Sequence, residues 1–273
     1  MIPKIIHQTW KDKSLPPILE EIVEHNKRLL IDNGYKFHLW TDDEIIELIK
    51  NKYPNILTLF EASITGVQRG DIARILLVHH YGGIYIDLDI LIIEDPINII
   101  DMNNDKLYIT YEPAAQTMKL YNKCDYLCNA FFAANAGNNM LNFAIQNMHA
   151  VFQRNGPKIF RSFDIFGGSY LKNIIDTYID HQKYINIIEN RDLIFPINDL
   201  KLNNLPCSKG DWDMVKSGYY GPNIVMVHYW IHGDFESKTL LQNFKVNKLI
   251  DIHQNMYKFF STLYPSIAKE MLE

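Results

Sequence analysis

The segment Gly82–Asp89, with the sequence Gly-Gly-Ile-Tyr-Ile-Asp-Leu-Asp, constrains this chain more than any other stretch. Paired glycines tolerate positive φ, so they predict that the preceding helix ends at residues 81–83. Residues 84–86 are β-branched or aromatic, which is typical of a short buried strand. The chain is therefore expected to pass from a helix into a strand that ends in two carboxylates, Asp87 and Asp89.

The spacing of these two carboxylates indicates a metal site. On an extended strand, Asp87 and Asp89 would share one face with their Cα atoms about 7 Å apart, because each residue adds ~3.3 Å. Like charges at that distance repel, and a divalent cation that also holds a diphosphate would relieve the repulsion. Two carboxylates that simply face water beyond the strand are the alternative interpretation.

A second charged pair lies just upstream, at Asp71 and Arg74. A helix is predicted over residues 71–80, and positions three apart share a helix face. This prediction places Asp71 in the first turn, where the helix dipole stabilises a carboxylate. An ordinary ion pair between Asp71 and Arg74 is the alternative to a role in ligand binding.

The N-terminal third of the chain has a β-α-β-α pattern, which is typical of the nucleotide-binding half of a mostly parallel sheet. A capping box at Thr41 and Glu44 marks the start of its second helix. The expected strands are 4–10, 35–40, 84–86 continued by 90–93, 107–110, 129–134 and 223–230. The expected helices are 16–34, 45–51, 56–63, 71–80, 139–152, 170–179 and a tail over 238–264, with a loop at 114–123.

The first predicted strand ends in polar and aromatic residues, at His7, Gln8, Thr9 and Trp10. Ligands of open α/β sheets bind beyond the carboxyl ends of the strands, so these residues are expected beside a bound nucleotide. The alternative for Trp10 is an aromatic residue of the core.

The run from residue 71 to residue 89 resembles the sugar-binding DXD region of glycosyltransferase family 32. That family includes initiating α-1,6-mannosyltransferases and capsular-polysaccharide transferases, and it is similar to the core of clostridial glucosylating toxins. Residues 3–10 and the His228-x-Trp230 pair also resemble family motifs. The resemblance implies an α/β, GT-A-like fold: a Rossmann-type, mixed, mainly parallel sheet flanked by helices, with a helical C-terminal addition.

The resemblance implies a Mn²⁺ or Mg²⁺ ion held by Asp89, with Asp87 on the ribose or reaching the metal through water. His228 would be the imidazole ligand, with His232 as the fallback, and a borderline cation such as Mn²⁺ accepts both oxygen and imidazole. A buried strand-end histidine bonded to backbone is the alternative for His228. The residues that would act in catalysis are Asp71, Arg74, Asp87 and Asp89.

The resemblance also implies a UDP- or GDP-linked sugar donor and a retained anomeric configuration. The expected donor-binding residues are His7, Gln8, Thr9, Trp10, Asp71, Arg74, Tyr85, Asp87 and Asn129. Asn129 has the alternative of capping a turn at a strand end. The expected acceptor-side residues are Asp164, Gly168, Ser169 and Trp230, where Gly167-Gly168-Ser169 departs from the usual Thr-Gly-Pro. The acceptor would be a glycan, a lipid-linked sugar or a protein.

Length and charge narrow the class of protein. The 273 residues carry a net charge of −5, which gives no electrostatic case for nucleic-acid binding. The three cysteines suggest reduced thiols rather than a disulfide framework or a zinc site. With no signal peptide and no apolar run of about 18 residues, we expect a soluble, cytoplasmic chain of bacterial or viral style. A peripheral membrane contact by the tail is the alternative.

The expected organisation is a single glycosyltransferase domain over residues 1–273. Its nucleotide-sugar half would be 1–100, its acceptor and metal half 101–235, and its helical tail 236–273. Two other functions stay open. A metal-dependent nucleotidyl- or phosphohydrolase would need the same acidic site but not residues 7–10 or the Asp71-x-x-Arg74 pair. A non-catalytic sugar-nucleotide-binding protein would keep the site without turnover.

Overall fold

The computed structural model describes residues 1–161, 165–202, 205, 208–231 and 235–272. Its main sheet has six strands in the order β2-β1-β3-β6-β5-β7. Strands β2, β1 and β3 run parallel, β6 is antiparallel to both β3 and β5, and β7 is parallel to β5. The mixed, mainly parallel sheet confirms the α/β class expected from the sequence.

The strands of the main sheet are short, and those between its two edge strands are largely buried. They are β1 (Ile5–Thr9), β2 (Lys36–Trp40), β3 (Gly83–Ile86), β5 (Leu107–Tyr111), β6 (Leu127–Ala134) and β7 (Ile185–Ile188). All but β7 lie where the sequence predicts strands. β7 forms one edge of the sheet and pairs with β5 alone.

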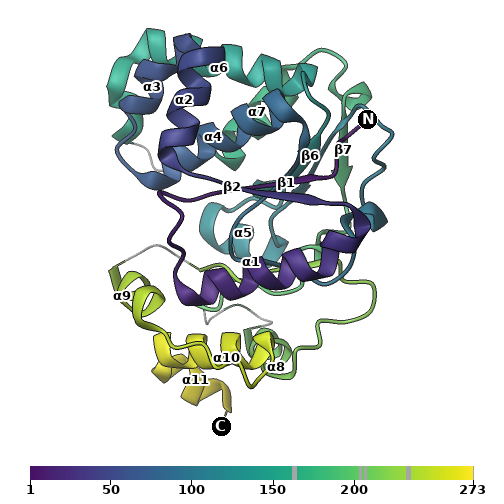
Figure 1. The fold of residues 1–273 in the computed structure, drawn as a ribbon, viewed down its shortest axis with the longest axis vertical. Coiled ribbons are helices and arrows are strands. Elements are labelled where there is room, and N and C mark those ends of the chain that lie inside the picture. Colours follow the sequence, from purple (N-terminus) through teal and green to yellow (C-terminus); the bar gives the residue numbers. More distant parts are fainter. Residues whose placement is uncertain (162–164, 203–204, 206–207, 232–234, 273) are drawn as a thin grey trace.

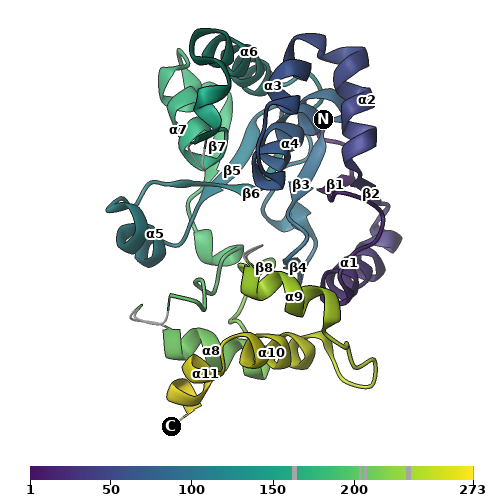
Figure 2. The ribbon, with the colours of Figure 1, turned by 90° about the vertical axis from the view of Figure 1, so that its left-hand side faces the viewer.

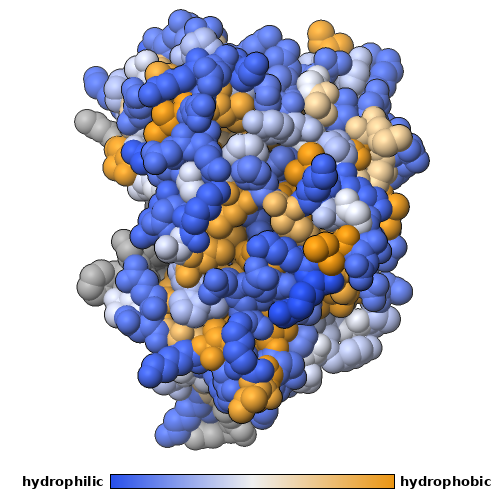
Figure 3. Space-filling view, in the orientation of Figure 1, coloured by the Kyte–Doolittle hydropathy of each residue, from blue (hydrophilic) through white to orange (hydrophobic). Residues whose placement is uncertain are grey.

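Helices cover both faces of this sheet (Figure 1). One face carries α2 (Asp42–Lys52), α3 (Leu57–Glu61), α4 (Gly66–Tyr81), α6 (Asn139–Asn155) and α7 (Gly168–Thr177). The other face carries α1 (Pro17–Leu30), which starts at a proline and buries Ile18, Leu19, Ile22 and Val23. A hydrophobic core lies on each side of the sheet. The outer surface in Figure 3 is mainly hydrophilic, with apolar residues in small groups.

A second, two-stranded sheet lies beneath the main one. It pairs β4 (Ile90–Ile92) with β8 (Met226–His228) in antiparallel fashion. The prediction that residues 90–93 continue the main strand is therefore wrong, and the strand expected over 223–230 is shorter. This small sheet connects the site segment to the C-terminal part of the chain.

The C-terminal part forms a helical layer below α1 (Figures 1 and 2). Its helices are α8 (Ser208–Ser217), α9 (Phe235–Asn243), α10 (Ile252–Leu263) and α11 (Pro265–Leu272). The tail predicted as one helix over 238–264 is wrong, because residues 244–251 separate α9 from α10. The expected helical addition is present, but it is made of several short helices.

Residues predicted as a loop at 114–123 include a helix, α5 (Ala114–Tyr121). It stands away from the rest of the molecule between β5 and β6 (Figure 2). The helix gives no amphipathic signal in the sequence because the two residues that it buries, Gln116 and Thr117, are polar. Asn122, in the left-handed conformation, ends it.

Two cysteines lie in the described part of the chain, and both are free: Cys124 is exposed and Cys128 is buried. Cys207 lies outside the described residues. Among the described residues, no helix combines the length and the apolar character needed to span a bilayer.

Candidate active site

The glycine pair between α4 and β3 brings the site segment alongside β1. Gly82 ends α4 with φ 65°, and a Cβ there would lie 2.6 Å from the amide nitrogen of Ala136. Gly83 has φ 110°, and a Cβ there would lie 2.6 Å from the carbonyl oxygen of Ile5. Both glycines are therefore needed for the left-handed backbone and for close strand packing. The predicted helix end is confirmed.

The start of α4 differs from the prediction. Thr65 and Gln68 form a capping box, and the helix begins at Gly66. Asp71 therefore lies in the second turn and not in the first, so the expected stabilisation by the helix dipole does not apply to it. This start is not evident from the sequence, because glycine and valine follow the cap.

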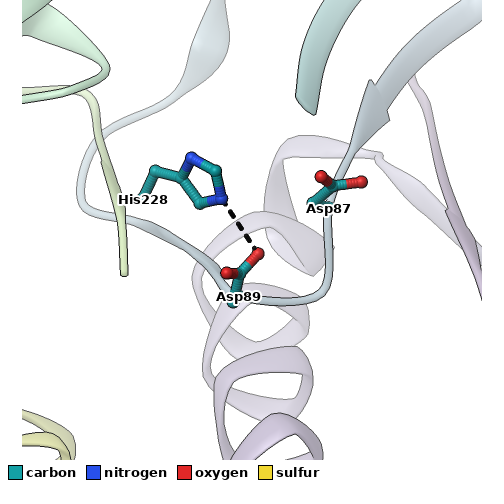
Figure 4. A group of neighbouring side chains, drawn as sticks. All are labelled: Asp87, Asp89 and His228. Atoms are coloured by element: carbon teal, nitrogen blue, oxygen red, sulfur yellow. Dashed lines mark ion pairs between the residues drawn. The ribbon is translucent and has the colours of Figure 1, made fainter. Parts of the chain in front are cut away.

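Asp87 and Asp89 lie in a turn and not on an extended strand. β3 ends at Ile86, and the amide of Ile90 donates to the carbonyl of Asp87 at 3.1 Å. The pairing of Ile90 with His228 in the small sheet then brings the histidine to the two carboxylates. One ligand atom from each of Asp87, Asp89 and His228 lies within 4.8 Å of the others (Figure 4). The three predicted metal ligands are thus brought together.

Asp89 is buried and held through both carboxylate oxygens. His228 Nε2 lies 3.2 Å from Oδ1, and the backbone amide of Ile231 donates to Oδ2 at 2.7 Å. Burial alone would raise the pKa of Asp89, but the charge of His228 and these hydrogen bonds hold that pKa below its usual value. Burial likewise opposes protonation of His228, yet the Asp89 carboxylate raises the pKa of the imidazole. Asp89 is thus held as a carboxylate.

Asp87 has a different set of neighbours. The hydroxyl of Tyr85 donates to its Oδ1 at 2.8 Å, and Arg74 Nη1 lies 3.3 Å from the same oxygen. Loss of solvent raises the pKa of Asp87, and the Arg74 guanidinium opposes that rise. The Tyr85 hydroxyl is itself 3.1 Å from the hydroxyl of Thr9. The end of β1 is thus linked to the first carboxylate.

Arg74 joins the parts of the site and is only 6% exposed. Besides Asp87, its guanidinium contacts Asp71 Oδ1 at 3.4 Å and donates to the carbonyl of Asn129 at 2.7 Å. It also lies over the ring of Tyr85, 4.7 Å from the centroid. The predicted Asp71–Arg74 pair is present, but it belongs to a buried network and not to an exposed helix surface.

Asn129 completes this network, because its side-chain amide donates to Asp71 Oδ1 at 2.7 Å. It lies at an irregularity of β6, where Ile109 pairs with Phe132 but Thr110 pairs with Cys128. Such a bulge redirects side chains out of the regular strand alternation. Asn129 therefore lies within the strand and does not cap a turn at its end.

The residues at the end of β1 divide into two kinds. Both ring nitrogens of His7 are used within the protein: Nε2 lies 2.8 Å from the carbonyl of Gly82, and Nδ1 accepts from Trp40 at 3.0 Å. Burial lowers the pKa of His7 to about 4. Gln8 Nε2 and Trp10 Nε1, by contrast, are buried without a hydrogen-bond partner in the described part of the chain. A role of His7 in donor binding stays a prediction.

Trp230 has a left-handed backbone, with φ 54°, which is uncommon for a bulky residue. Its indole donates to the carbonyl of Ile197 at 3.0 Å, and its ring centroid lies 4.0 Å from that of His228. The conformation at Trp230 directs the next amide, that of Ile231, at Asp89. The role of Ile231 cannot be predicted from the sequence, because a backbone donor leaves no side-chain signal.

The predicted acceptor-side residues are only partly described. Gly168 begins α7, and a Cβ there would lie 1.9 Å from the carbonyl oxygen of Leu127, so packing against β6 requires glycine. Ser169 follows it in the same helix. Asp164 and the fallback ligand His232 lie outside the described residues. The acceptor roles of Gly168, Ser169 and Trp230 stay predictions.

A comparison with protein families places the site segment in a known sequence class. Residues 19–107 match the family described as "Glycosyltransferase sugar-binding region containing DXD motif". The matched range includes Asp71, Arg74, Asp87 and Asp89. The resemblance to DXD-containing glycosyltransferases that the sequence suggested is thereby confirmed.

Curated proteins match about a third of the chain. Inositol phosphoceramide mannosyltransferase 1 of Schizosaccharomyces pombe is 39% identical over 90 residues, covering 33% of this chain and 28% of that protein. A mannosyl phosphorylinositol ceramide synthase of Saccharomyces cerevisiae is 44% identical over 89 residues, covering 33% of this chain and 23% of that protein. The chain thus spans less than a third of the length of these relatives.

A solved structure supports the fold over nearly the whole chain. The apo-form glycosyltransferase GlyE of Streptococcus pneumoniae superposes with a TM-score of 0.50, covering 98% of this chain and 64% of that one at 12% identity. This likeness concerns the fold alone, and it confirms the GT-A-like architecture expected from the sequence.

Proposed function

We propose that this chain is a metal-dependent glycosyltransferase that moves a hexosyl group from a nucleoside diphosphate sugar to an acceptor hydroxyl with retention of configuration. The observation that carries the proposal is the convergence of Asp87, Asp89 and His228 within 4.8 Å, beside the Arg74 network. The curated relatives are named as mannosyltransferases acting on inositol phosphoceramide. We therefore take a mannosyl group as the first sugar to test and an inositol phospholipid as the first acceptor.

The three ligand atoms fit a divalent cation. Two carboxylate oxygens and one imidazole nitrogen form a donor set that Mn²⁺ accepts more readily than Mg²⁺ does. Asp89 and His228 would be direct ligands, and Asp87 would hold the ribose or reach the cation through water. When bound, the cation would neutralise the charge that develops on the diphosphate leaving group.

The surrounding side chains would bind and orient the donor. The unpartnered N–H groups of Gln8 and Trp10 are available to a nucleotide, since buried donors are nearly always paired. Asp71 and Asn129 together offer a carboxylate and an amide to sugar hydroxyls. Because Asp71 is engaged by both Arg74 and Asn129, we assign it to sugar binding and not to covalent attack. Transfer on the same face as the leaving group is then the route that we propose.

A hydrolase or nucleotidyltransferase would share the metal ligands but has no need of the buried Arg74–Asp71–Asn129 network. The nucleotide product separates these functions. A glycosyltransferase releases the nucleoside diphosphate and transfers the sugar, whereas a phosphohydrolase releases the monophosphate. A binding protein releases neither.

The test uses GDP-mannose and three UDP-sugars (glucose, galactose and N-acetylglucosamine) with an inositol phospholipid as the acceptor, each with Mn²⁺ and with EDTA. A donor at about 100 times its dissociation constant should stabilise the protein by ~2.7 kcal/mol. The Asp89→Asn variant should lose this metal-dependent stabilisation, and it should no longer release the nucleoside diphosphate. The matched control is Asp213→Asn, an exposed aspartate of α8, which should behave like wild type.

Each outcome has a defined meaning. Release of the nucleoside diphosphate, together with labelled sugar in the lipid fraction, supports the proposal, whichever donor reacts. Monophosphate release would replace it with the hydrolase. Binding without either product, or equal activity of the Asp89→Asn variant, would overturn it.

A further inference from the structure

The last turn of α5 exposes apolar side chains to solvent. Met118 is 44% exposed, and Leu120 and Tyr121 are each 46% exposed. All of residues 118–125 are exposed, so this is the end of a projecting element (Figure 2). Exposed apolar groups gathered at one place on a soluble surface mark contact sites. We call residues 118–123 the α5 tip.

The base of this element is fastened to the body, so the tip is held in place. Arg191 Nη1 donates to the carbonyl of Glu112 at 2.6 Å and to that of Cys124 at 3.1 Å. These bonds join the two ends of the segment that connects β5 to β6 and contains α5. Gln116 accepts from the amide of Asp199 at 2.9 Å. The tip is therefore presented in a fixed position, and its apolar side chains are not the ends of a loose loop.

The tip lies at the edge of the sheet that carries the site. It follows β5 and precedes β6, the strand that carries Asn129, and Asn129 bonds to Asp71. Two more exposed apolar residues, Ile64 (70%) and Val67 (48%), lie just before Asp71 at the start of α4. Exposed apolar side chains therefore occur both near the start of α4 and at the α5 tip.

The tip is also basic. Lys119 and Lys123 are exposed, and neither has an ion pair in the described part of the chain. The nearby Asp125 lies 3.6 Å from Lys172, which also pairs with Asp176 at 2.6 Å. The whole chain has a net charge of −5, so attraction to an anionic surface must be local to such a tip. Apolar side chains between lysines are typical of segments that enter the headgroup region of a bilayer.

We propose that the α5 tip docks on an anionic lipid bilayer and so holds the site beside an acceptor that is embedded in that bilayer. The inference rests on the proposed transfer to a lipid acceptor and names the surface that would reach it. The C-terminal helices are a weaker choice, because Met256, Phe259 and Phe260 of α10 are buried in the core.

The test is flotation of the whole chain with vesicles of phosphatidylcholine alone, or with about 30% phosphatidylserine. The tip variant is M118Q/L120Q/Y121Q, and the charge variant is K119Q/K123Q. The matched control is I179Q/L249Q, which removes two apolar side chains that are 85% and 93% exposed elsewhere. Circular dichroism and thermal unfolding establish that each variant is folded.

Wild type and the control should float with the anionic vesicles. The tip variant should bind at least about tenfold more weakly, and the charge variant should lose the preference for phosphatidylserine. Wild type that stays unbound at every composition, or a control variant that loses as much binding as the tip variant, would overturn the inference. Self-association that the tip variant abolishes, without vesicle binding, would replace the bilayer with a second copy of the chain.

Donor binding measured without vesicles keeps this test separate from the proposed function. The tip variant should bind a nucleotide sugar as wild type does, because Met118, Leu120 and Tyr121 are not among the predicted donor-binding residues or metal ligands. Vesicle binding without donor binding would refute the glycosyltransferase proposal and leave the docking surface. Donor binding without vesicle binding would refute the docking surface alone.

Discussion

The amide of Ile231 donates a 2.7 Å hydrogen bond to Oδ2 of Asp89, across 142 positions of sequence. His228 Nε2 lies 3.2 Å from the other oxygen of the same carboxylate. The last residue of β8 and the short segment that follows it therefore set the orientation of Asp89 from both sides. It can do so because the intervening Trp230 has a left-handed backbone. Residues held in such conformations often lie at functional sites.

Trp230 is predicted to be a positioning residue for the metal ligands. The Trp230→Ala variant loses the ring packed against His228, at 4.0 Å, and against Phe195, at 5.6 Å. We expect Mn²⁺ affinity to fall about 10-fold or more, as is common when groups that orient metal ligands are removed. Isothermal titration calorimetry measures this directly.

The control is Trp230→Phe, which keeps an aromatic ring beside His228 and loses the indole bond to Ile197. It should be less stable by about 1 kcal/mol and should retain most of the Mn²⁺ affinity. Equal affinities of the alanine variant and wild type would contradict the positioning role.

Much of the site was predictable because its signals are local. The Thr41–Glu44 capping box, the glycine pair and the β-branched strand each depend on a few neighbouring residues, and the structure contains all three. Asp71 and Arg74 are three apart on one helix, so their proximity needs no knowledge of the fold. The order of elements in the N-terminal third followed from the same local patterns.

What could not be predicted depends on contacts between distant segments. The turn at residues 87–89 forms because β4 leaves the main sheet to pair with β8, more than 130 residues away. The partners of His7 come from Gly82 and Trp40. The sequence predicts a loop where α5 lies, because the residues that this helix buries are polar. In each case the deciding partner lies far along the chain or leaves no hydrophobic pattern.

Arg74→Met should destabilise the fold strongly. The substitution leaves the buried Asp71 and the partly exposed Asp87 without their cation, and loss of one partner of a buried ion pair typically costs about 3–5 kcal/mol. The control is Arg69→Met, because Arg69 is 39% exposed and meets one carboxylate, Asp42, at 3.5 Å. That exposed pair should contribute at most about 1 kcal/mol.

Urea unfolding of both variants measures these free energies. A loss of less than about 1 kcal/mol for Arg74→Met would mean that Asp71 and Asp87 take up protons at little cost. The buried network would then not depend on the guanidinium charge.

Gly168→Ala is predicted to disturb the contact between α7 and β6. The added Cβ would lie 1.9 Å from the Leu127 carbonyl oxygen, so backbone must move. Overpacking of this kind costs about 1–3 kcal/mol. Gly210→Ala in α8 is the matched control, since nothing lies within 4 Å of its Cβ. Alanine there should stabilise the helix by up to about 1 kcal/mol. Thermal unfolding of the two variants should show a lower melting temperature for Gly168→Ala and a higher one for Gly210→Ala. A Gly168→Ala variant that is more stable than wild type would refute the contact with Leu127.

His7 makes the stability of the fold depend on pH. Its ring is 1% exposed, and burial lowers its pKa to about 4 from the ordinary value of 6.5. Between these values the unfolded chain binds a proton that the folded chain does not, so stability is full above pH 6.5 and falls as the pH drops toward 4. The loss from this residue should approach about 3 kcal/mol.

The His7→Gln variant isolates this contribution from the other histidines. Gln cannot titrate, so the variant should start less stable at pH 7 but lose less stability on acidification. Urea unfolding at several pH values from 7 to about 4 gives both slopes. Five other histidines also have lowered pKa values: His25, His38, His79, His80 and His253. They are present in both proteins, so their contribution to the pH dependence cancels when the two slopes are subtracted. Identical slopes for the two proteins would show that the pKa of His7 is the same in the folded and unfolded states, against the lowered pKa that burial and the bonds of the neutral ring to Gly82 and Trp40 imply.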